Sequence, residues 1–479
     1  MTHALETETI ALNHWLYAEG LGLPVDEHAL TAHSDTLANL YGQLLDSPDL
    51  GLRYFALESW SEARRVLLDY RLNDLRDRHL TVPGLTCSEG PLTWRNWKVF
   101  ERENDDAAPL AVAFDELLNR SQALAPSLAQ RLDSVRADFA TRALTPAHTF
   151  AFRENIPLES LRPFLLSLGQ ACRAPFQHAV NQLSHSVFRR PAGPAELHAL
   201  YLNRMYELHA PVFGAQPETQ TAGRIVRAAQ SAFHRLGFDL THIPVDIENR
   251  PRKYPGAFCF PIATPADVRV SVRLASPPHL VDMLYHEFGH AVHFSGIRAD
   301  LPFIDRYWIH SGVHETFSTL FESLLHDPVF LREQFGFDDT ASEQLVEFGR
   351  FKLLLTGTWL NASALTALDA WLEGLTWPQI ETRYAEHFLA FTGLPIPGGL
   401  ARLEPFIAST SIYPAGYVLA MVRVAHWLKR LRALSGAAWW QSPEARAEVW
   451  ERVKAGGAVR FPAEWLEVNA NFFSTDGTN

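Results

Sequence analysis

Two histidines and a glutamate stand close together in the segment His286-Glu287-Phe288-Gly289-His290. On a helix, positions four apart lie one turn apart on the same face, so both imidazoles can reach one ion. Zinc binds neutral imidazole and anionic ligands, and a catalytic zinc site leaves one position open for water. The five residues therefore predict two metal ligands, His286 and His290, with Glu287 as the general base beside them.

The residues around this motif predict an amphipathic helix. Apolar residues spaced four, four and three apart form one stripe: Leu280, Leu284, Phe288 and Ala291. His286, His290 and His293 fall on the opposite side. The helix can therefore bury its apolar stripe and turn its histidines toward a cleft. The alternative is a chance occurrence of the motif without a metal.

A carboxylate suited to be a third ligand follows at Glu315, 29 residues after His286 (315 − 286). The segment 310–325 has an apolar face and a polar face, and Glu315 lies on the polar one with Ser318, Thr319 and Glu322. This separation allows a loop between two neighbouring helices, so Glu315 can complete a His, His, Glu shell. Glu322 is expected either to orient His286 or His290 from behind or to be solvated.

The extended zinc motif H-E-x-x-H-x-x-G-x-x-H is not met. It requires glycine three places after the second histidine and histidine six places after it. Here these positions hold His293 and Gly296, the reverse order. His293 is therefore expected to be buried or to contact a ligand from behind, and not to bind the metal itself.

These segments together resemble the thimet oligopeptidase and oligoendopeptidase F family of zinc metallopeptidases. The resemblance rests on the motif, the preceding Tyr-Pro-Gly-Ala-Phe-Cys at 254–259, the Glu315 helix and a Tyr-Pro-Ala-Gly-Tyr at 413–417, and it covers roughly residues 220–430. It implies one zinc per chain, with Glu315 as a ligand and Glu322 as the second acid. It also implies that Tyr417, and more weakly Tyr413, contact the substrate carbonyl or the oxyanion.

The chain departs from the larger members of this family in two places. No histidine lies between Arg402 and Tyr417, and Ala420 stands where some members have a tyrosine. The Glu315 segment also resembles the zinc metallocarboxypeptidases typified by the Thermus enzyme. The resemblance therefore implies a zinc endopeptidase acting on short peptides, with a zinc carboxypeptidase and a non-catalytic peptide-binding protein as alternatives.

One strand is predicted just before the metal helix. Valines and Leu274 alternate with polar residues over 268–274, the period-two pattern of a half-exposed strand. In peptidases of this class an edge strand beside the metal helix holds an extended peptide. That role is expected for Gly256, Ala257 and Phe258 or for the strand itself. Arg252 and Lys253 are expected to be solvated or to meet a substrate carboxylate.

The fold class predicted is mainly α: two helical halves flanking a deep channel, with a small β-sheet beside the zinc helix. Residues 1–190 are expected to form one wall and 191–479 the catalytic region. Long helical runs are predicted at 53–78, 109–143 and 158–188, and Val-Pro-Gly at 82–84 is interpreted as a turn.

Composition agrees with an enzyme of the cytoplasm. The 479 residues contain three well-separated cysteines, which favours reduced thiols. The start of the chain has no signal-peptide pattern, and no apolar run is long enough to span a membrane. A net charge of −12 speaks against nucleic acid and anionic membranes as partners. Short peptides are the expected partners, and the sequence leaves the oligomeric state open.

Overall fold

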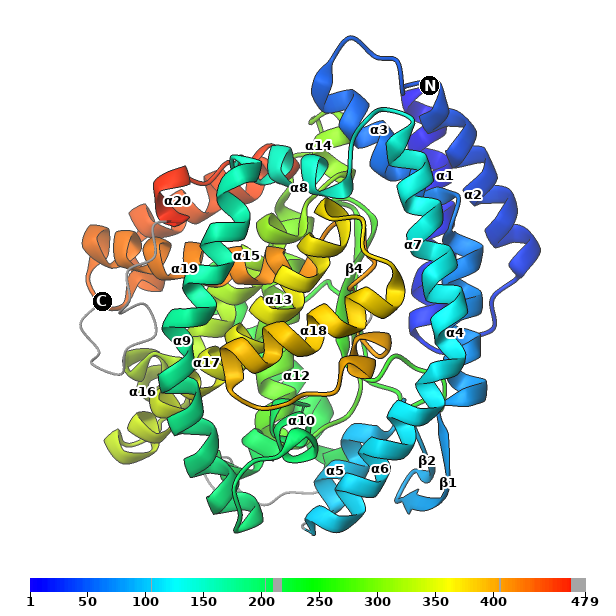
Figure 1. The fold of residues 1–479 in the computed structure, drawn as a ribbon. Coiled ribbons are helices and arrows are strands. Elements are labelled where there is room, and N and C mark those ends of the chain that lie inside the picture. Colours follow the sequence, from blue (N-terminus) through cyan, green and yellow to red (C-terminus); the bar gives the residue numbers. More distant parts are fainter. Residues whose placement is uncertain (105, 203, 210–217, 405, 467–479) are drawn as a thin grey trace. The chain divides into compact units, whose positions relative to one another are not determined.

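The structure is a computed structural model that describes residues 1–104, 106–202, 204–209, 218–404 and 406–466. The described residues are mainly helical, with a small sheet packed on α13 (Pro277–Gly296), as predicted, and with a second, two-stranded sheet that was not predicted (Figure 1). The chain forms two compact units, each made of several segments. Unit 1 comprises 1–19, 24–204 and 355–418, and unit 2 comprises 20–23, 205–354 and 419–479. The predicted functional division near residue 190 and the predicted channel stay proposals.

Unit 1 is built from helices and one hairpin. Helix α2 packs against α3 and α4, and the long helix α9 packs against α18 (Figure 1). Its elements are α1 (Thr2–Gly20), α2 (Glu27–Gly42), α3 (Leu50–Ala63), α4 (Val66–His79), β1 (Thr81–Cys87), β2 (Gly90–Thr93), α5 (Trp97–Glu103), α6 (Ala107–Arg120), η1 (Ser121–Leu124), α7 (Ala125–Ala140), α8 (Pro146–Glu154), α9 (Leu158–Phe188), α10 (Pro194–Leu202), the later part of α17 (Asp339–Leu372), α18 (Trp377–Thr392) and η4 (Gly398–Arg402).

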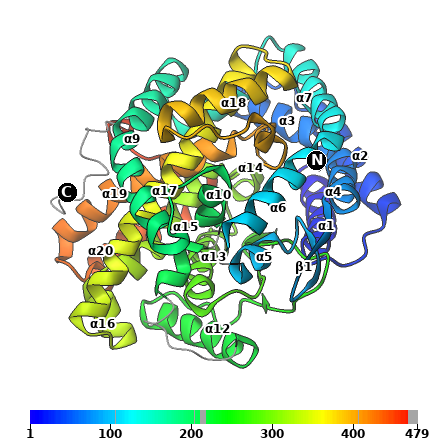
Figure 2. The same ribbon diagram turned by 60° about the horizontal axis from the view of Figure 1, so that its bottom comes forward.

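Unit 2 surrounds helix α13, which packs against α12, α15, α20 and the sheet; Figure 2 shows α12 from below. Its elements are η2 (Arg204–His209), α12 (Glu218–Arg235), β3 (Val245–Asp246), β4 (Ala257–Ala263), β5 (Asp267–Val272), α13 (Pro277–Gly296), α14 (Phe303–Tyr307), α15 (Ser311–Glu322), η3 (Ser323–His326), α16 (Pro328–Phe335), the start of α17, most of α19 (Tyr413–Ser435), η5 (Trp439–Gln441), α20 (Pro443–Lys454), η6 (Gly456–Ala458) and η7 (Ala463–Leu466).

The sheet of unit 2 has the order β3-β5-β4. Strand β5 is the predicted strand, and it pairs parallel with β3 and antiparallel with β4. Its valines Val268, Val270 and Val272 are buried against the core around α13. Strand β4 therefore lies at one edge of this sheet. Pro261 of β4 has no N–H to offer a further strand, which limits pairing at such an edge.

Two of the three predicted helical runs are broken. The run 53–78 is divided into α3 and α4 at Arg64 and Arg65, and 109–143 is divided by η1 before Pro126, a residue suited to begin a helix. The run 158–188 is one helix, as predicted. The turn prediction at 82–84 was wrong, because these residues belong to strand β1 of a hairpin with β2.

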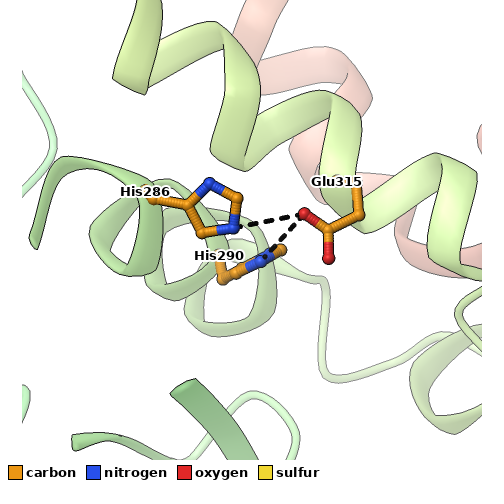
Figure 3. A group of neighbouring side chains, drawn as sticks. All are labelled: His286, His290 and Glu315. Atoms are coloured by element: carbon orange, nitrogen blue, oxygen red, sulfur yellow. Dashed lines mark ion pairs between the residues drawn. The ribbon is translucent and has the colours of Figure 1, made fainter. Parts of the chain in front are cut away.

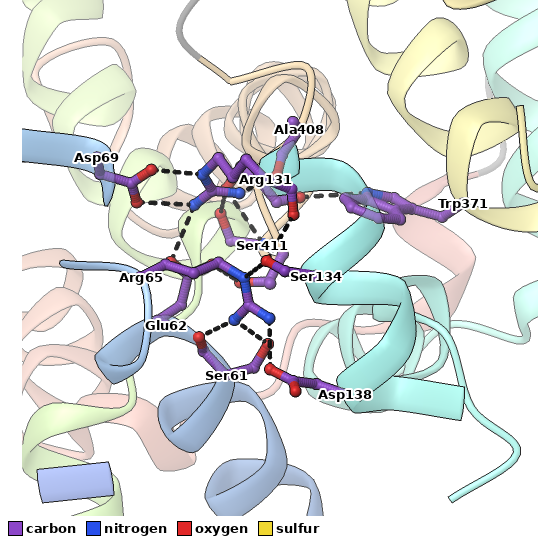
Figure 4. A network of polar contacts seen from close by, with 12 residues as sticks. Ser61, Glu62, Arg65, Asp69, Arg131, Ser134, Asp138, Trp371, Ala408 and Ser411 are labelled. Atoms are coloured by element: carbon purple, nitrogen blue, oxygen red, sulfur yellow. Dashed lines mark hydrogen bonds and ion pairs between the residues drawn. The ribbon is translucent and has the colours of Figure 1, made fainter. Parts of the chain in front are cut away.

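A partly buried group of charges connects helices of unit 1 (Figure 4). Arg131 of α7 donates from Nε to Asp69 of α4 at 2.7 Å and from Nη2 to Glu62 of α3 at 3.0 Å. Arg65 pairs with Asp138 of α7. We call Glu62, Arg65, Asp69, Arg131 and Asp138 the Arg131 cluster. Charge pairing of this kind satisfies groups that would be costly to bury alone.

Two predictions from composition can be compared with the fold. Cys87, Cys172 and Cys259 form no disulfide. Among the described residues, none of the helices combines the length and the apolar character that crossing a membrane requires.

Candidate metal centre

The motif lies on α13, and the predicted apolar stripe of this helix is buried. Leu280, Leu284, Phe288 and Ala291 are each at most 2 % exposed. They pack in one core with Phe233 and with the apolar side of α15. Burial of this stripe fixes the rotation of α13 about its axis. The opposite face carries His286, Glu287 and His290.

Gly289 allows α15 to approach α13 closely at the motif itself. A Cβ atom at this position would lie 2.6 Å from Ser318 Cα and 2.8 Å from the carbonyl oxygen of Phe317. Any larger residue would therefore force the helix backbones apart. The glycine inside the motif thus has a packing reason, and it brings Glu315 of α15 within reach of both histidines.

The three predicted ligands converge (Figure 3). One ligand atom each from His286, His290 and Glu315 lies within 4.8 Å of the others. Glu315 Oε2 is 3.3 Å from His286 Nε2 and 3.4 Å from His290 Nε2. Two ligand atoms bound at about 2.0–2.1 Å in a tetrahedron are about 3.3 Å apart. The group therefore fits a zinc ion in both its donor types and its spacing.

Two residues of α15 support the ligands from behind. His286 Nδ1 lies 2.7 Å from Glu322 Oε2, which leaves Nε2 for the metal. The Ser318 hydroxyl donates to Glu315 Oε2 at 2.8 Å. Burial alone would raise the pKa of Glu315, but the neighbouring His290 and His286 lower it well below its ordinary value.

Glu287 is buried beside the ligands and is held by strand β4. Its carboxylate accepts a hydrogen bond from the backbone N–H of Cys259. Burial raises its pKa above the ordinary value, although the two histidines oppose this rise. A carboxylate with a raised pKa is suited to take up a proton and to return it.

A buried lysine lies behind Glu322. Lys352 Nζ is 2.5 Å from Glu322 Oε1 and contacts both oxygens of Asp282, at 2.6 and 2.5 Å. Tyr206 donates from its hydroxyl to Asp282 Oδ2 at 2.8 Å. We call Tyr206, Asp282, Glu322 and Lys352 the Lys352 cluster. Burial would lower the pKa of Lys352, but the charges of Asp282 and Glu322 raise it well above its ordinary value.

Lys352, Asp282 and Tyr206 were not predicted from the sequence as part of the site. Asp282 stands four residues before His286, on the same helix face, which was an available signal. No comparable signal marks Lys352, a single lysine in the mostly apolar run 351–360.

The other predicted residues lie in different surroundings. His293 is fully buried, and its ring stacks on Phe317 with centroids 4.1 Å apart. Tyr413 and Tyr417 begin α19 and are partly buried, with ring centroids 5.3 Å apart. Both tyrosines belong to unit 1, and the three predicted metal ligands belong to unit 2. Their contact with a reacting group stays a proposal.

The register of β4 shows which of its residues direct their backbone N–H and C=O groups away from β5. The N–H of Arg273, the residue after β5, donates to the carbonyl oxygen of Gly256, the residue before β4. These two residues therefore form a hydrogen-bonded pair at the end of the two strands. Pairing alternates along an antiparallel strand. The N–H and C=O groups of Ala257 and Cys259 therefore point away from β5, and Cys259 N–H reaches Glu287 accordingly. Phe258 faces β5 with its backbone groups.

Lys253 differs from both expectations for it. It is 0 % exposed, and its Nζ contacts four oxygen atoms. These are Oδ1 of Asp246 and the backbone carbonyl oxygens of Asp246, Glu248 and Val272. It is therefore neither solvated nor able to meet a substrate. Gly22, with φ +72°, passes close to the backbone of this lysine. The sequence before β4 is thereby fixed from two sides.

Comparison with known proteins gives similarity in structure alone. No family model matches the sequence, and no curated protein does. Pz peptidase A with a bound inhibitor matches 94 % of this chain and 83 % of its own at a TM-score of 0.60 and 14 % identity. A protein from Bacillus anthracis described as an oligoendopeptidase F matches 95 % and 81 % (TM-score 0.57, 12 % identity).

Metallocarboxypeptidase 1 of Trypanosoma cruzi matches 98 % of this chain and 97 % of its own, at a TM-score of 0.54 and 12 % identity. Endopeptidases and carboxypeptidases are thus both among the structural neighbours. The resemblance that the motifs indicated is confirmed at the level of the fold. The chain has the zincin-like fold shared by the oligoendopeptidase F type of metallopeptidase and the metallocarboxypeptidases.

Proposed function

We propose that this protein is a zinc-dependent endopeptidase that hydrolyses short peptides. The observation that carries the proposal is the spacing of Glu315 Oε2 from the two histidine nitrogens, 3.3 and 3.4 Å, beside the buried carboxylate of Glu287. Two imidazoles and one carboxylate form the ligand set of a catalytic zinc site, and a glutamate beside them can serve as the general base.

Zinc bound to His286, His290 and Glu315 would supply a Lewis acid that polarises the peptide carbonyl and makes water available as a nucleophile near neutral pH. Glu287 takes the proton from the attacking water and then gives it to the leaving amine. The hydrogen bond from Cys259 N–H holds this carboxylate in place between the two transfers.

Strand β4 supports the binding of an extended peptide. Ala257 N–H and C=O point away from β5, as does Cys259 C=O, and can pair with a peptide backbone. Main-chain pairing accepts many side chains, which suits a peptidase for varied short peptides. Among the residues predicted for this role, Ala257 has the suitable orientation. Gly256 and Phe258 direct their backbone groups to β5.

Tyr417 and, more weakly, Tyr413 are proposed as donors to the oxyanion. The support is their position at the start of α19, with the Tyr413 ring stacked on Phe406 at 4.4 Å. A hydroxyl held by such packing costs little to orient during the reaction.

A zinc carboxypeptidase is the second candidate. It is favoured by the match in length, because the chain covers 97 % of the Trypanosoma cruzi metallocarboxypeptidase and 81–83 % of the two oligopeptidase structures. Both candidates use the same metal chemistry and differ in the bond that is cut. We also propose a cytoplasmic location, because the three cysteines form no disulfide.

The test is mass spectrometry of peptide digests by the purified parent and by Glu287→Gln. Each peptide is offered with free ends and with acetylated and amidated ends. We expect internal cleavage of the blocked peptides by the parent. We expect Glu287→Gln to keep its zinc and to lose at least ~100-fold in turnover, because the acid/base group is removed.

Stepwise loss of C-terminal residues from free peptides, with blocked peptides left intact, would favour the carboxypeptidase. Equal hydrolysis by Glu287→Gln and the parent would contradict the assigned base. Absence of hydrolysis by a zinc-loaded parent would leave the peptide-binding alternative in place of both enzymes.

A further inference from the structure

The Lys352 cluster connects the metal centre to a helix that carries none of its ligands. Lys352 lies on α17, Glu322 at the end of α15, and Asp282 on α13. Lys352 and Asp282 are 8 % and 7 % exposed, and Tyr206 is 4 % exposed. Buried charges need partners, and here one ammonium group lies between two carboxylates.

Glu322 uses its two oxygens for two different partners. Oε1 accepts from Lys352 Nζ at 2.5 Å, and Oε2 contacts His286 Nδ1 at 2.7 Å. The carboxylate is therefore fixed at both ends, and it cannot turn without losing a charged hydrogen bond. The direction of the His286 ring depends on the direction of this carboxylate.

Lys352 is itself held on its other side. Both oxygens of Asp282 accept from Nζ, and the hydroxyl of Tyr206 holds Oδ2. Without the ammonium group, Asp282 and Glu322 would be two buried carboxylates with the same charge near each other. Repulsion would move Glu322 out of line with His286.

We propose that Lys352 is a positioning residue of the metal centre: its ammonium group holds Glu322 in the orientation that directs Nε2 of His286 toward the metal. The inference rests on the proposed metal site and adds to it a residue 66 positions from His286 (352 − 286). Removing a partner behind a ligand typically weakens metal binding by about 10–100-fold.

The experiment compares Lys352→Met with the parent, with Glu322→Gln and with Lys253→Met. Lys253→Met is the matched control, because Lys253 is also a buried, ion-paired lysine of unit 2, but its partners lie around the sheet. The zinc affinity of each protein is measured by competition with a chromophoric chelator. The visible absorption of the Co²⁺-loaded proteins reports the geometry of the ligands.

We expect Lys352→Met and Glu322→Gln to bind zinc about 10–100-fold more weakly than the parent. Both should change the Co²⁺ spectrum in the same way. The double variant Lys352→Met/Glu322→Gln should lose no more affinity than either single variant, because Lys352 acts through Glu322. Lys253→Met should lose stability and keep the zinc affinity and the Co²⁺ spectrum of the parent.

A second variant, Lys352→Met/Asp282→Asn, removes one charge of each sign and should fold more readily than Lys352→Met. It should still bind zinc weakly, because Glu322 has lost its anchor. Parent-like affinity and spectrum in a folded Lys352→Met or in this variant would overturn the proposal. Failure of both to fold, while Lys253→Met folds, would assign Lys352 to the fold and overturn it too. A parent that binds neither metal would instead contradict the proposed function.

Discussion

Each unit contains a buried cation between two carboxylates, but the two cations are connected to different parts of the chain. Lys352 in unit 2 lies between Asp282 and Glu322, and Glu322 contacts His286, a proposed metal ligand. Arg131 in unit 1 lies between Glu62 and Asp69, and it also donates to the carbonyl of Ala408. The first cation orients a side chain of the proposed reaction, and the second holds a chain segment.

The segment held by the Arg131 cluster leads directly into the proposed tyrosines. Thr410 donates to Glu62, and the next residues are Ser411 and Ile412 (Figure 4 shows the charges). Ile412 is fully buried and has a φ of 44°, which is unusual for a β-branched residue. Such a conformation persists where its surroundings fix it. Similar charge pairing thus serves a proposed metal ligand in one unit and a backbone segment in the other.

The largest expected effect comes from removing the metal. Dialysis against a chelator should abolish peptide hydrolysis, and added zinc should restore it, because no residue can replace the Lewis acid. The Arg131 cluster has no part in metal binding, so hydrogen exchange of α3, α4 and α7 should be unchanged. Full activity in the metal-free protein would contradict the metal site.

Tyr417→Phe tests whether the tyrosine that follows the segment held by the Arg131 cluster donates to the oxyanion. Loss of an oxyanion donor should lower kcat about 100-fold, with zinc affinity unchanged. Tyr413→Phe is the control at the neighbouring ring, and it should lower kcat less. Steady-state kinetics on one blocked peptide measures both. Parent-like kcat in Tyr417→Phe would remove this tyrosine from the mechanism.

Gly289→Ala tests how strongly the proposed metal centre depends on the close packing of α13 and α15. The added Cβ would lie 2.6 Å from Ser318 Cα, so α15 and Glu315 must shift. We expect a loss of about 1–3 kcal/mol in the free energy of unfolding. Zinc affinity should fall about tenfold, which equals about 1.4 kcal/mol.

The control for this substitution is Gly223→Ala on helix α12 of the same unit. A Cβ there would meet Arg227 at an ordinary 3.6 Å, so this variant should be neutral or gain about 0.5–1 kcal/mol. Equal zinc affinity in Gly289→Ala and Gly223→Ala would show that Glu315 does not need the close crossing of the helices.

Arg131→Met should affect stability far more than metal binding. We expect the free energy of unfolding to fall by about 2–3 kcal/mol, less than for a fully buried pair, because Glu62 and Asp69 keep 36 % of their side chains exposed. Urea unfolding measures this loss. Arg71→Met, at an exposed ion pair with Glu27, should cost at most about 1 kcal/mol. Weaker zinc binding in Arg131→Met than in Lys352→Met would contradict the assignment of Lys352 to the metal centre and of Arg131 to the fold of unit 1.

The sequence predicted what depends on local periodicity. The motif helix, its buried stripe and strand β5 follow from spacing, and Glu315 follows from its place on a second amphipathic helix. What the sequence did not reveal depends on distant contacts. Lys352 gains its partners 30 and 70 residues away, and Arg65 interrupts a predicted helix while pairing with Asp138, 73 residues away. Spacing within one helix contains no information on such pairs.

The most direct measurement is anomalous diffraction at the zinc edge from crystals of the zinc-loaded protein. We expect one strong peak per chain, about 2 Å from His286 Nε2, His290 Nε2 and Glu315 Oε2, the usual length of such bonds. A zinc peak elsewhere, or density in which Glu315 turns away from the ion, would contradict it.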